Sequence, residues 1–284
     1  AVNKIIGEAI ESDETYRKKM LPEDDRCWTL VYAELAENIG LKLDVVPSVH
    51  EDTDGVMRLV IASVDYKYAK SAISITERIS KTYKWIPSNP EGFGVWFDEI
   101  NEPFLKMVLK EQKESIFKNY RSLFENSASV DDVPDFYVKS PLQRTIQLLK
   151  RHRDIYYYRN KAISEYRPAS IIITSLAAKV AKNTPALSLE ELLPHIVNGI
   201  ADYAILLQGK VPEAKVAGEE RNFIYKQESK WYIPNPVDPA DNYADSWSDE
   251  IAKAFFDWTE AVKRDLSETS CLNEMRYMAG LQTS

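Results

Sequence analysis

The stretch that decides the fold reads Leu41-Lys42-Leu43-Asp44-Val45-Val46-Pro47. In an extended strand its odd-numbered and even-numbered residues face opposite sides, so Asp44 projects from an otherwise apolar strand. A carboxylate in such a place is costly to desolvate unless it is paired or holds a metal ion. The residues alone leave two readings open for Asp44: a Mg²⁺ ligand, or a structural carboxylate that pairs with a lysine or caps a turn.

The residues around this stretch predict a small β-rich region. Residues 27–32 are rich in β-branched and aromatic side chains, and the turn-forming residues 37–40 separate them from residues 41–46. This spacing predicts a pair of strands. Further extended stretches are expected at residues 57–64 and 72–76. Two prolines and an asparagine within residues 87–90 indicate a turn, where the β-rich part ends.

Most of the remaining chain has helical periodicity. Helices are expected at residues 4–20, 102–126, 140–163, 168–183, 188–207 and 248–268. Ser188 and Glu191 have capping-box spacing, and Phe255, Phe256 and Trp258 are expected in the core. Residues 209–247 predict an irregular segment with a short hairpin at 223–233. We therefore expect an α+β protein with a mixed-sheet region at residues 1–90 and a helical domain at 91–284.

Composition excludes several classes of protein. The 284 residues are 44% hydrophobic and 28% charged, with a net charge of −8, which excludes disordered and collagen-like chains. Cys27 and Cys271 do not form a C-x-x-C pair, and no long apolar run occurs, so we expect a cytoplasmic protein without a membrane partner. The sequence also lacks the Rossmann glycine fingerprint, the P-loop, the H-E-x-x-H zinc motif and the G-x-S-x-G elbow.

Charge is unevenly distributed along the chain. Residues 140–170 hold seven basic against two acidic side chains, a net charge of +5, whereas residues 219–284 hold seven basic against thirteen acidic, a net charge of −6. This asymmetry favours a compact anionic ligand over a long nucleic acid. The alternative is that the basic run is a solvated helix face.

Several motifs in order resemble one family over nearly the whole chain. They lie at residues 26–33, 43–47, 88–97, 142–154, 167–172, 235–245 and 255–258. The set resembles the CD-NTases, the bacterial relatives of cyclic GMP-AMP synthase and oligoadenylate synthase, including the DncV-like enzymes of CBASS antiphage systems. The resemblance implies part of a polymerase-β-like nucleotidyltransferase core, followed by a helical domain like that of oligoadenylate synthase.

The family resemblance also implies an activity. It indicates an enzyme of the bacterial cytoplasm that joins nucleoside triphosphates such as ATP and GTP into a cyclic di- or trinucleotide, which activates a downstream effector in antiphage defence. Two alternatives stay open. One is linear addition of nucleotides to an acceptor, which the acidic residues 219–284 disfavour. The other is a catalytically incomplete, nucleotide-binding relative.

The resemblance assigns roles to four residues. Asp44 matches the third metal-ligating carboxylate and is thereby catalytic, with Mg²⁺ as the expected cofactor and Mn²⁺ as the alternative ion. Lys150, Ser170 and Arg153 match the triphosphate-binding region, where Ser170 lies at a helix N-terminus that favours anions. Ile171 stands where the eukaryotic relatives have a base-stacking tyrosine, so a tyrosine at 156–158 or 225–232 is expected to take that part.

The sequence also departs from the family. The Gly-Ser loop and the Asp-x-Asp strand, which should precede the helix expected at residues 4–20, are both missing, and the adjacent Asp24 and Asp25 are a poor substitute. The chain opens on Ala1 and enters a helical pattern at once. We therefore expect an N-terminally truncated family member that begins inside a longer coding sequence and is inactive alone.

Overall fold

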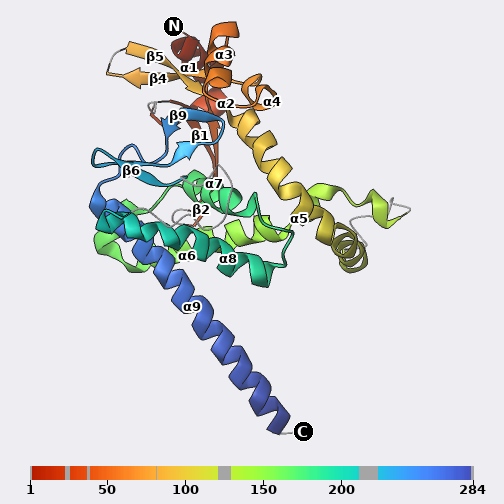
Figure 1. The fold of residues 1–284 in the computed structure, drawn as a ribbon. Coiled ribbons are helices and arrows are strands. Elements are labelled where there is room, and N and C mark those ends of the chain that lie inside the picture. The colour runs from red at the N-terminus through yellow and green to blue at the C-terminus, as the bar shows by residue number, and fades with distance from the viewer. Residues whose placement is uncertain are drawn as a thin grey trace. The chain divides into compact units, whose positions relative to one another are not determined.

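The computed structural model describes two compact units, shown together in Figure 1. It describes residues 2–22, 26–36, 39–80, 82–120, 129–210 and 223–282, with only the backbone given for 33–36, 39–40, 132, 136 and 268–282. The first unit comprises Ala1–Trp96 together with Val237–Pro239, and the second comprises Phe97–Pro236 and Ala240–Ser284. The mixture of helices and small sheets is that of an α+β protein.

The first unit begins with two helices rather than the single one expected at residues 4–20. Helix α1 spans Val2–Ser12 and helix α2 spans Glu14–Arg17. Asp13 separates them, because its carboxylate accepts a hydrogen bond from the backbone N–H of Thr15 at 2.8 Å and so starts a new helix. The periodicity of apolar residues at 4–20 predicted helical structure, but it did not indicate that a cap at Asp13 divides the segment into two helices.

The predicted strand pair is confirmed. Strand β1, Trp28–Ala36, pairs antiparallel with strand β2, Ile39–Val45. The register places Thr29 opposite Asp44. Residues 37–38 of the expected turn and the Asp24–Asp25 pair lie outside the described residues.

The strand expected at residues 57–64 is wrong, because helix α3 occupies Thr53–Ile61. Asp52 caps this helix by accepting the N–H of Gly55 at 2.9 Å. Val56, Leu59 and Val60 have helical spacing, and they pack in one apolar cluster. The helical spacing of the apolar residues and the cap at Asp52 favour a helix here more strongly than the β-branched composition favours a strand.

A three-stranded antiparallel sheet and a short helix complete most of this unit. Its order is β3 (Ser48–His50), β4 (Ile73–Ile79) and β5 (Thr82–Ser88), and helix α4 spans Tyr66–Ala69. The strand expected at 72–76 is confirmed as part of β4. Strand β5 ends and helix α5, Pro90–Asn119, begins within the predicted turn, where Asn89 Oδ1 accepts the N–H of Gly92 at 3.0 Å.

One ion pair fixes the segment Val237–Pro239 in the first unit. Both guanidinium Nη atoms of Arg58 donate to the carboxylate of Asp238 at 3.1 Å. Asp238 is buried, at 2% exposure, and the hydrogen bonds that Arg58 donates to this carboxylate raise the pKa of Arg58. The segment is therefore held by a charged pair in bidentate geometry.

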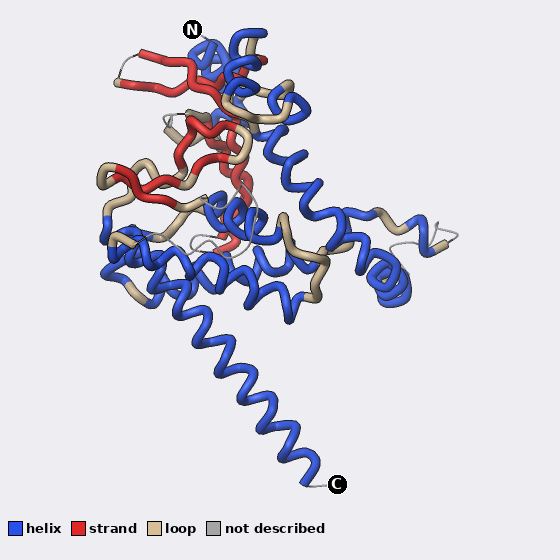
Figure 2. The backbone as a smooth tube through the Cα atoms, in the orientation of Figure 1, coloured by secondary structure: helices blue, strands red, loops and turns tan. Residues whose placement is uncertain are grey.

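The second unit is mainly helical, and Figure 2 separates its helices from its short strands. Its helices after α5 are α6 (Pro141–Arg159), α7 (Ser170–Ala181), α8 (Leu189–Ala201) and α9 (Asp249–Gln282), with 3₁₀ turns at Val130–Asp132, Asp135–Tyr137, Lys161–Tyr166 and Asp202–Gln208. Its strands are β6 (Tyr225–Gln227), β7 (Lys230–Tyr232), β8 (Pro234–Asn235) and β9 (Asp238–Asn242), the last of which starts in the segment grouped with the first unit. The hairpin expected at 223–233 is confirmed as β6–β7.

Helices α6, α7, α8 and α9 pack around a common core. The expected core residues Phe255, Phe256 and Trp258 are all buried, at 0–2% exposure. The capping box of Ser188 and Glu191 is confirmed, with both of its hydrogen bonds present. No helix among the described residues is both long and apolar enough to span a membrane.

Two glycines of the first unit give a stability prediction with opposite signs. Alanine stabilises a helix interior by about 1 kcal/mol relative to glycine. At Gly94 an added Cβ meets nothing within 4 Å, so Gly94→Ala is expected to raise the free energy of unfolding by about that amount. At Gly7 the added Cβ overlaps the indole of Trp28, so Gly7→Ala is expected to lower it by about 1–3 kcal/mol. Urea unfolding of both variants checks the signs, and a stabilised Gly7→Ala would contradict the packing of Trp28 on α1.

Candidate functional site

Asp44 lies near the end of β2, where pairing with β1 sets its surroundings. Thr29 Oγ1 donates a hydrogen bond to Asp44 Oδ1 at 2.7 Å. The carboxylate is exposed, and the apolar neighbours Leu41 and Leu43 are themselves 63% and 49% exposed. Asp44 therefore avoids the cost of desolvation in this structure, because both faces of this strand end reach solvent. Of the structural alternatives, neither a lysine partner nor a capped turn is found for Asp44 among the described residues.

The surroundings of Asp44 fit a metal ion only in part. Mg²⁺ in proteins is held by one or two carboxylates together with substrate phosphates and water, and Asp44 can supply one carboxylate. Within the ranges that the structure describes, no three His, Cys, Asp or Glu side chains gather in a group that would hold a metal ion. Asp44 is thus a candidate ligand whose described neighbours do not complete a two-metal site.

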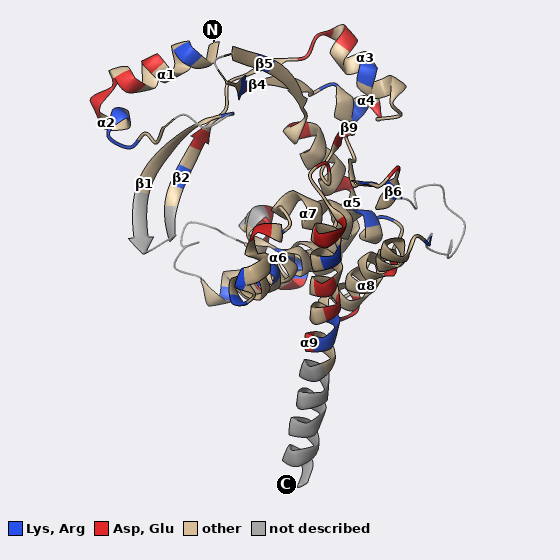
Figure 3. Cartoon of the chain, turned by 90° about the vertical axis from the view of Figure 1, so that its left-hand side faces the viewer, with Lys and Arg blue, Asp and Glu red and all other residues tan. Residues whose placement is uncertain are grey.

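Helix α6 presents Lys150 as an unpaired, half-buried cation. The helix starts with a capping box of Ser140 and Gln143, which fixes its first turn. Among the described residues Lys150 Nζ has no hydrogen bond or ion pair, and burial, followed by repulsion from Arg153, lowers the pKa of Lys150. Figure 3 shows basic residues along this helix. A cation that is partly desolvated without a partner favours an incoming anion.

Arg153 lies one turn further along α6 and connects it to the start of α7. Its guanidinium is buried, at 7% exposure. Nη1 donates to the carbonyl of Pro168 at 2.9 Å and to Ser170 Oγ at 3.1 Å, while Nε and Nη2 donate to Asp154 Oδ1 at 3.0 and 2.8 Å. The N–H groups of Arg153 that form these hydrogen bonds therefore bind protein groups, and one of the bonds holds Ser170 in place.

The N-terminus of α7 keeps its first-turn amides uncapped by any side chain. Its N-cap residue is Ala169, which has no side chain for that purpose. Ser170 is the first residue of the helix, and it is exposed. Amide groups and a hydroxyl at a helix N-terminus suit an anionic ligand such as phosphate.

The structure brings three of the four predicted site residues into one neighbourhood. Lys150 and Arg153 share one face of α6, and Arg153 is hydrogen-bonded to Ser170. Asp44, the fourth predicted site residue, belongs to the first unit, whereas the other three belong to the second. Sequence reasoning missed two supporting residues. Thr29 is hydrogen-bonded to Asp44, and Asp154 is hydrogen-bonded to Arg153. The one signal for Asp154 was its position directly after Arg153.

The three consecutive tyrosines of α6 face different directions, as the sequence predicted. Tyr157 is 1% exposed and donates from its hydroxyl to the carbonyl of Ala254 at 3.1 Å, and burial raises its pKa far above the ordinary value. Tyr158 is 72% exposed. Tyr157 is thus a core residue, and a nucleotide base cannot reach its ring.

The chain is similar to two curated proteins over most of its length. It is 29% identical over 248 residues to a c-di-GMP synthase of Roseivirga ehrenbergii, covering 87% of this chain and 50% of that protein. It is 24% identical over 247 residues to the cyclic dinucleotide synthase CdnG of Bradyrhizobium diazoefficiens, covering 82% of this chain and 47% of that protein. These matches support CD-NTase family membership. The resemblance named from the sequence is confirmed at that level.

The similarity to these two curated relatives has defined limits. This chain spans about half the length of the curated relatives it matches. No family model matches it. No solved structure matches it either.

Proposed function

We propose that this chain is part of an enzyme that joins two nucleoside triphosphates into a cyclic dinucleotide. The observation that carries the proposal is the group formed by Lys150, Arg153 and Ser170, which presents an unpaired cation and an uncapped helix N-terminus in the same neighbourhood. Both curated relatives are named as cyclic dinucleotide synthases, which supports this reading of the site.

In this proposal each unit has a separate task. The first unit corresponds to part of a polymerase-β-like core, where Asp44 would ligate Mg²⁺, or Mn²⁺ in its place. When bound, the metal ion neutralises negative charge on the triphosphate. The second unit corresponds to the oligoadenylate-synthase-like domain, in which Lys150 and Ser170 bind the triphosphate and Arg153 orients Ser170.

The wider role follows the family resemblance. We place the enzyme in the bacterial cytoplasm, with ATP, GTP or related triphosphates as substrates. Its cyclic product would activate a downstream effector in antiphage defence. The net negative charge of residues 219–284 supports a small nucleotide over a long nucleic acid as the bound species.

Triphosphate binding tests the proposed site directly. Lys150→Gln is expected to weaken the binding of ATP and of GTP by about 10- to 100-fold, the worth of a charge-assisted hydrogen bond to phosphate. Isothermal titration calorimetry without metal measures this affinity. Arg151→Gln is the matched control, because Arg151 is an exposed cation on the same helix that points elsewhere. An equal loss of affinity in both variants would contradict a specific role for Lys150 and would mean that it belongs to a solvated basic face.

The lowered pKa of Lys150 adds a pH dependence to the same measurement. A bound phosphate favours the charged ammonium, so binding must raise this pKa. As the pH rises through this lowered pKa, binding is then expected to take up protons, and affinity is expected to fall. Titrations in buffers of different ionisation enthalpy detect the uptake, which Lys150→Gln should abolish.

A nucleotide-binding protein without catalysis is the second candidate function. The observation in its favour is that the described residues hold no complete group of metal ligands. Incubating the whole gene product with ATP, GTP and Mg²⁺, followed by mass spectrometry of the nucleotides, separates the two candidates. A cyclic dinucleotide supports the enzyme, whereas retained triphosphate binding without any product supports the binder.

A further inference from the structure

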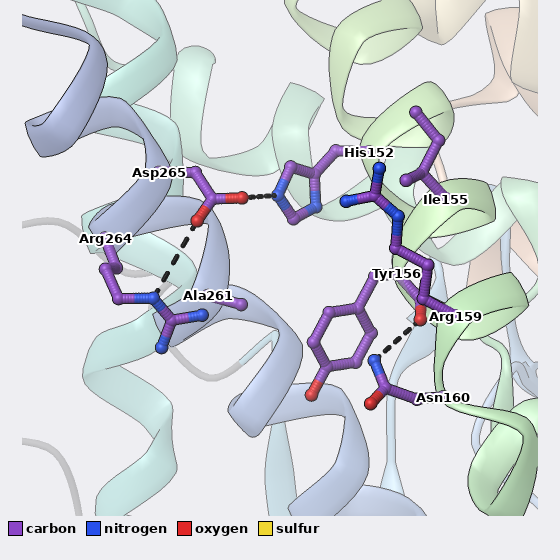
Figure 4. Close-up of a pocket in the computed structure, with 8 residues that line it drawn as sticks. All are labelled: His152, Ile155, Tyr156, Arg159, Asn160, Ala261, Arg264 and Asp265. Carbon is purple, nitrogen blue, oxygen red and sulfur yellow. Dashed lines mark hydrogen bonds and ion pairs between the residues drawn. The ribbon is translucent and has the colours of Figure 1, made fainter. Parts of the chain in front are cut away.

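A hollow of the helical unit lies between α6 and α9, and Lys150 is not among the residues that line it. It is open to solvent and has a volume of about 600 Å³, within the range of small-molecule sites. Figure 4 shows its walls, with side chains of α6 on one side and those of α9 on the other. Its lining residues are His152, Ile155, Tyr156, Arg159, Asn160, Ala261, Arg264 and Asp265.

The hollow uses a different face of α6 from the proposed triphosphate site. At about 100° per residue, positions 152, 155, 156 and 159 share one side of the helix. Lys150 and Arg153 project from another side. A ligand in the hollow is therefore distinct from a triphosphate at Lys150, although one helix carries both.

One wall of the hollow is fixed by a chain of hydrogen bonds. The indole Nε1 of the buried Trp258 donates to His152 Nδ1 at 3.0 Å. His152 Nδ1 must therefore be an acceptor, which places the ring proton on Nε2, where it meets Asp265 Oδ2 at 3.0 Å. The plane of the imidazole lies within 20° of the Tyr156 ring, with centroids 6.5 Å apart.

The charged groups of the hollow leave a positive excess. Asp265 is engaged by His152 and lies 3.8 Å from the guanidinium Nε of Arg264. The guanidinium group of Arg159 has no hydrogen bond or ion pair within the described part of the chain. Two guanidinium groups thus face one carboxylate that is already hydrogen-bonded, and arginine is well suited to bind phosphate.

We propose that this hollow binds a nucleoside monophosphate, with the phosphate between Arg159 and Arg264 and the base against Tyr156. Ile155 and Ala261 line the same hollow as Tyr156 and add apolar surface to it, which suits a planar heterocycle. Burial raises the pKa of Tyr156, so its phenol stays protonated at neutral pH and available as a donor. The ligand class follows from one anionic group, one flat aromatic group and the size of the space.

The test uses the Lys150→Gln protein, so that the proposed triphosphate site does not contribute. Binding of GMP and of AMP is measured by calorimetry at physiological salt in three proteins: Lys150→Gln alone, Lys150→Gln with Arg159→Gln and Arg264→Gln, and Lys150→Gln with Arg151→Gln and Lys263→Gln. The last carries the same charge change on the same two helices outside the hollow. Thermal unfolding midpoints verify that all three are folded.

We expect saturable binding of one nucleotide per chain, weakened at least about tenfold by the Arg159 and Arg264 changes and within about twofold in the control. An equal loss in the control would overturn the proposal in favour of general electrostatics. Absence of saturable binding in Lys150→Gln alone would overturn it as well. Inorganic phosphate is titrated in parallel, and an affinity equal to that of GMP would overturn the nucleotide assignment.

Discussion

For the proposed reaction, replacing Asp44 with Asn is expected to lower cyclic dinucleotide synthesis by the whole gene product about a thousandfold. Metal ions contribute several kcal/mol to the stabilisation of charge in a phosphoryl-transfer transition state, and each 1.36 kcal/mol corresponds to a factor of ten in rate. Asparagine keeps the size of the side chain and can still accept the hydrogen bond of Thr29, but it loses the negative charge that a Mg²⁺ ligand needs. Product formation per minute at saturating triphosphate measures the effect.

Two comparisons separate a metal ligand from a structural carboxylate at this position. Triphosphate affinity without metal is expected to stay within about twofold in Asp44→Asn, because Lys150 and Ser170 are unchanged. Asp54→Asn is the control, since Asp54 is an exposed carboxylate of the same unit. If Asp44→Asn retained full turnover, or lost it together with its folded structure, the metal-ligand assignment would be wrong.

Replacing Arg153 with Met is expected to have the largest effect on the helical unit. The variant leaves the buried carbonyl of Pro168 without its donor and releases Ser170, so the free energy of unfolding should fall by about 2–3 kcal/mol. Triphosphate affinity should also fall about tenfold, because Ser170 is no longer held at the helix start. Urea unfolding and calorimetry measure the two effects separately.

A double-mutant cycle shows whether Arg153 acts through Ser170 or touches the phosphate itself. If Arg153 is a positioning residue, its substitution and Ser170→Ala are expected to be strongly non-additive in triphosphate affinity. Arg153→Lys should recover little, because an ammonium cannot reproduce the planar guanidinium, whose Nη1 reaches Pro168 and Ser170 while its Nε and Nη2 reach Asp154. Additive losses, with full rescue by lysine, would instead mean a direct contact between Arg153 and the ligand.

Local patterns predicted the elements whose determinants lie close together in sequence. The capping box at Ser188 and the buried spacing of Phe255, Phe256 and Trp258 both depend on residues within one or two helical turns. The strand pair around Asp44 was predicted from the β-branched and aromatic composition of residues 27–32 and the alternation of residues 41–46 after a short turn. Residues 57–64 misled the prediction because their valines and isoleucine suit strands, whereas the cap at Asp52 and the packing around Leu59 select a helix.

The geometry of the site could be predicted only in part. The resemblance to a known family indicated Lys150, Arg153 and Ser170, but the hydrogen bond between Arg153 and Ser170 depends on how α6 and α7 pack. Sequence could not tell that Arg153 is buried, because charged residues are rarely buried unless paired. Its neighbour Asp154 is one partner, but the carbonyl of Pro168 and the hydroxyl of Ser170 belong to another segment. The exposure of Asp44 likewise depends on what covers its strand.

The bond between Arg58 and Asp238 has a consequence for the order in which the protein is made. Asp238 follows Arg58 by 180 residues, yet both belong to the first unit. A chain emerging from the ribosome folds from its N-terminus, so the first unit must wait for most of the second to be synthesised before the ion pair of Arg58 and Asp238 can form. A chain ended before residue 237 would leave Arg58 without this carboxylate, and the first unit would lack one of its own parts.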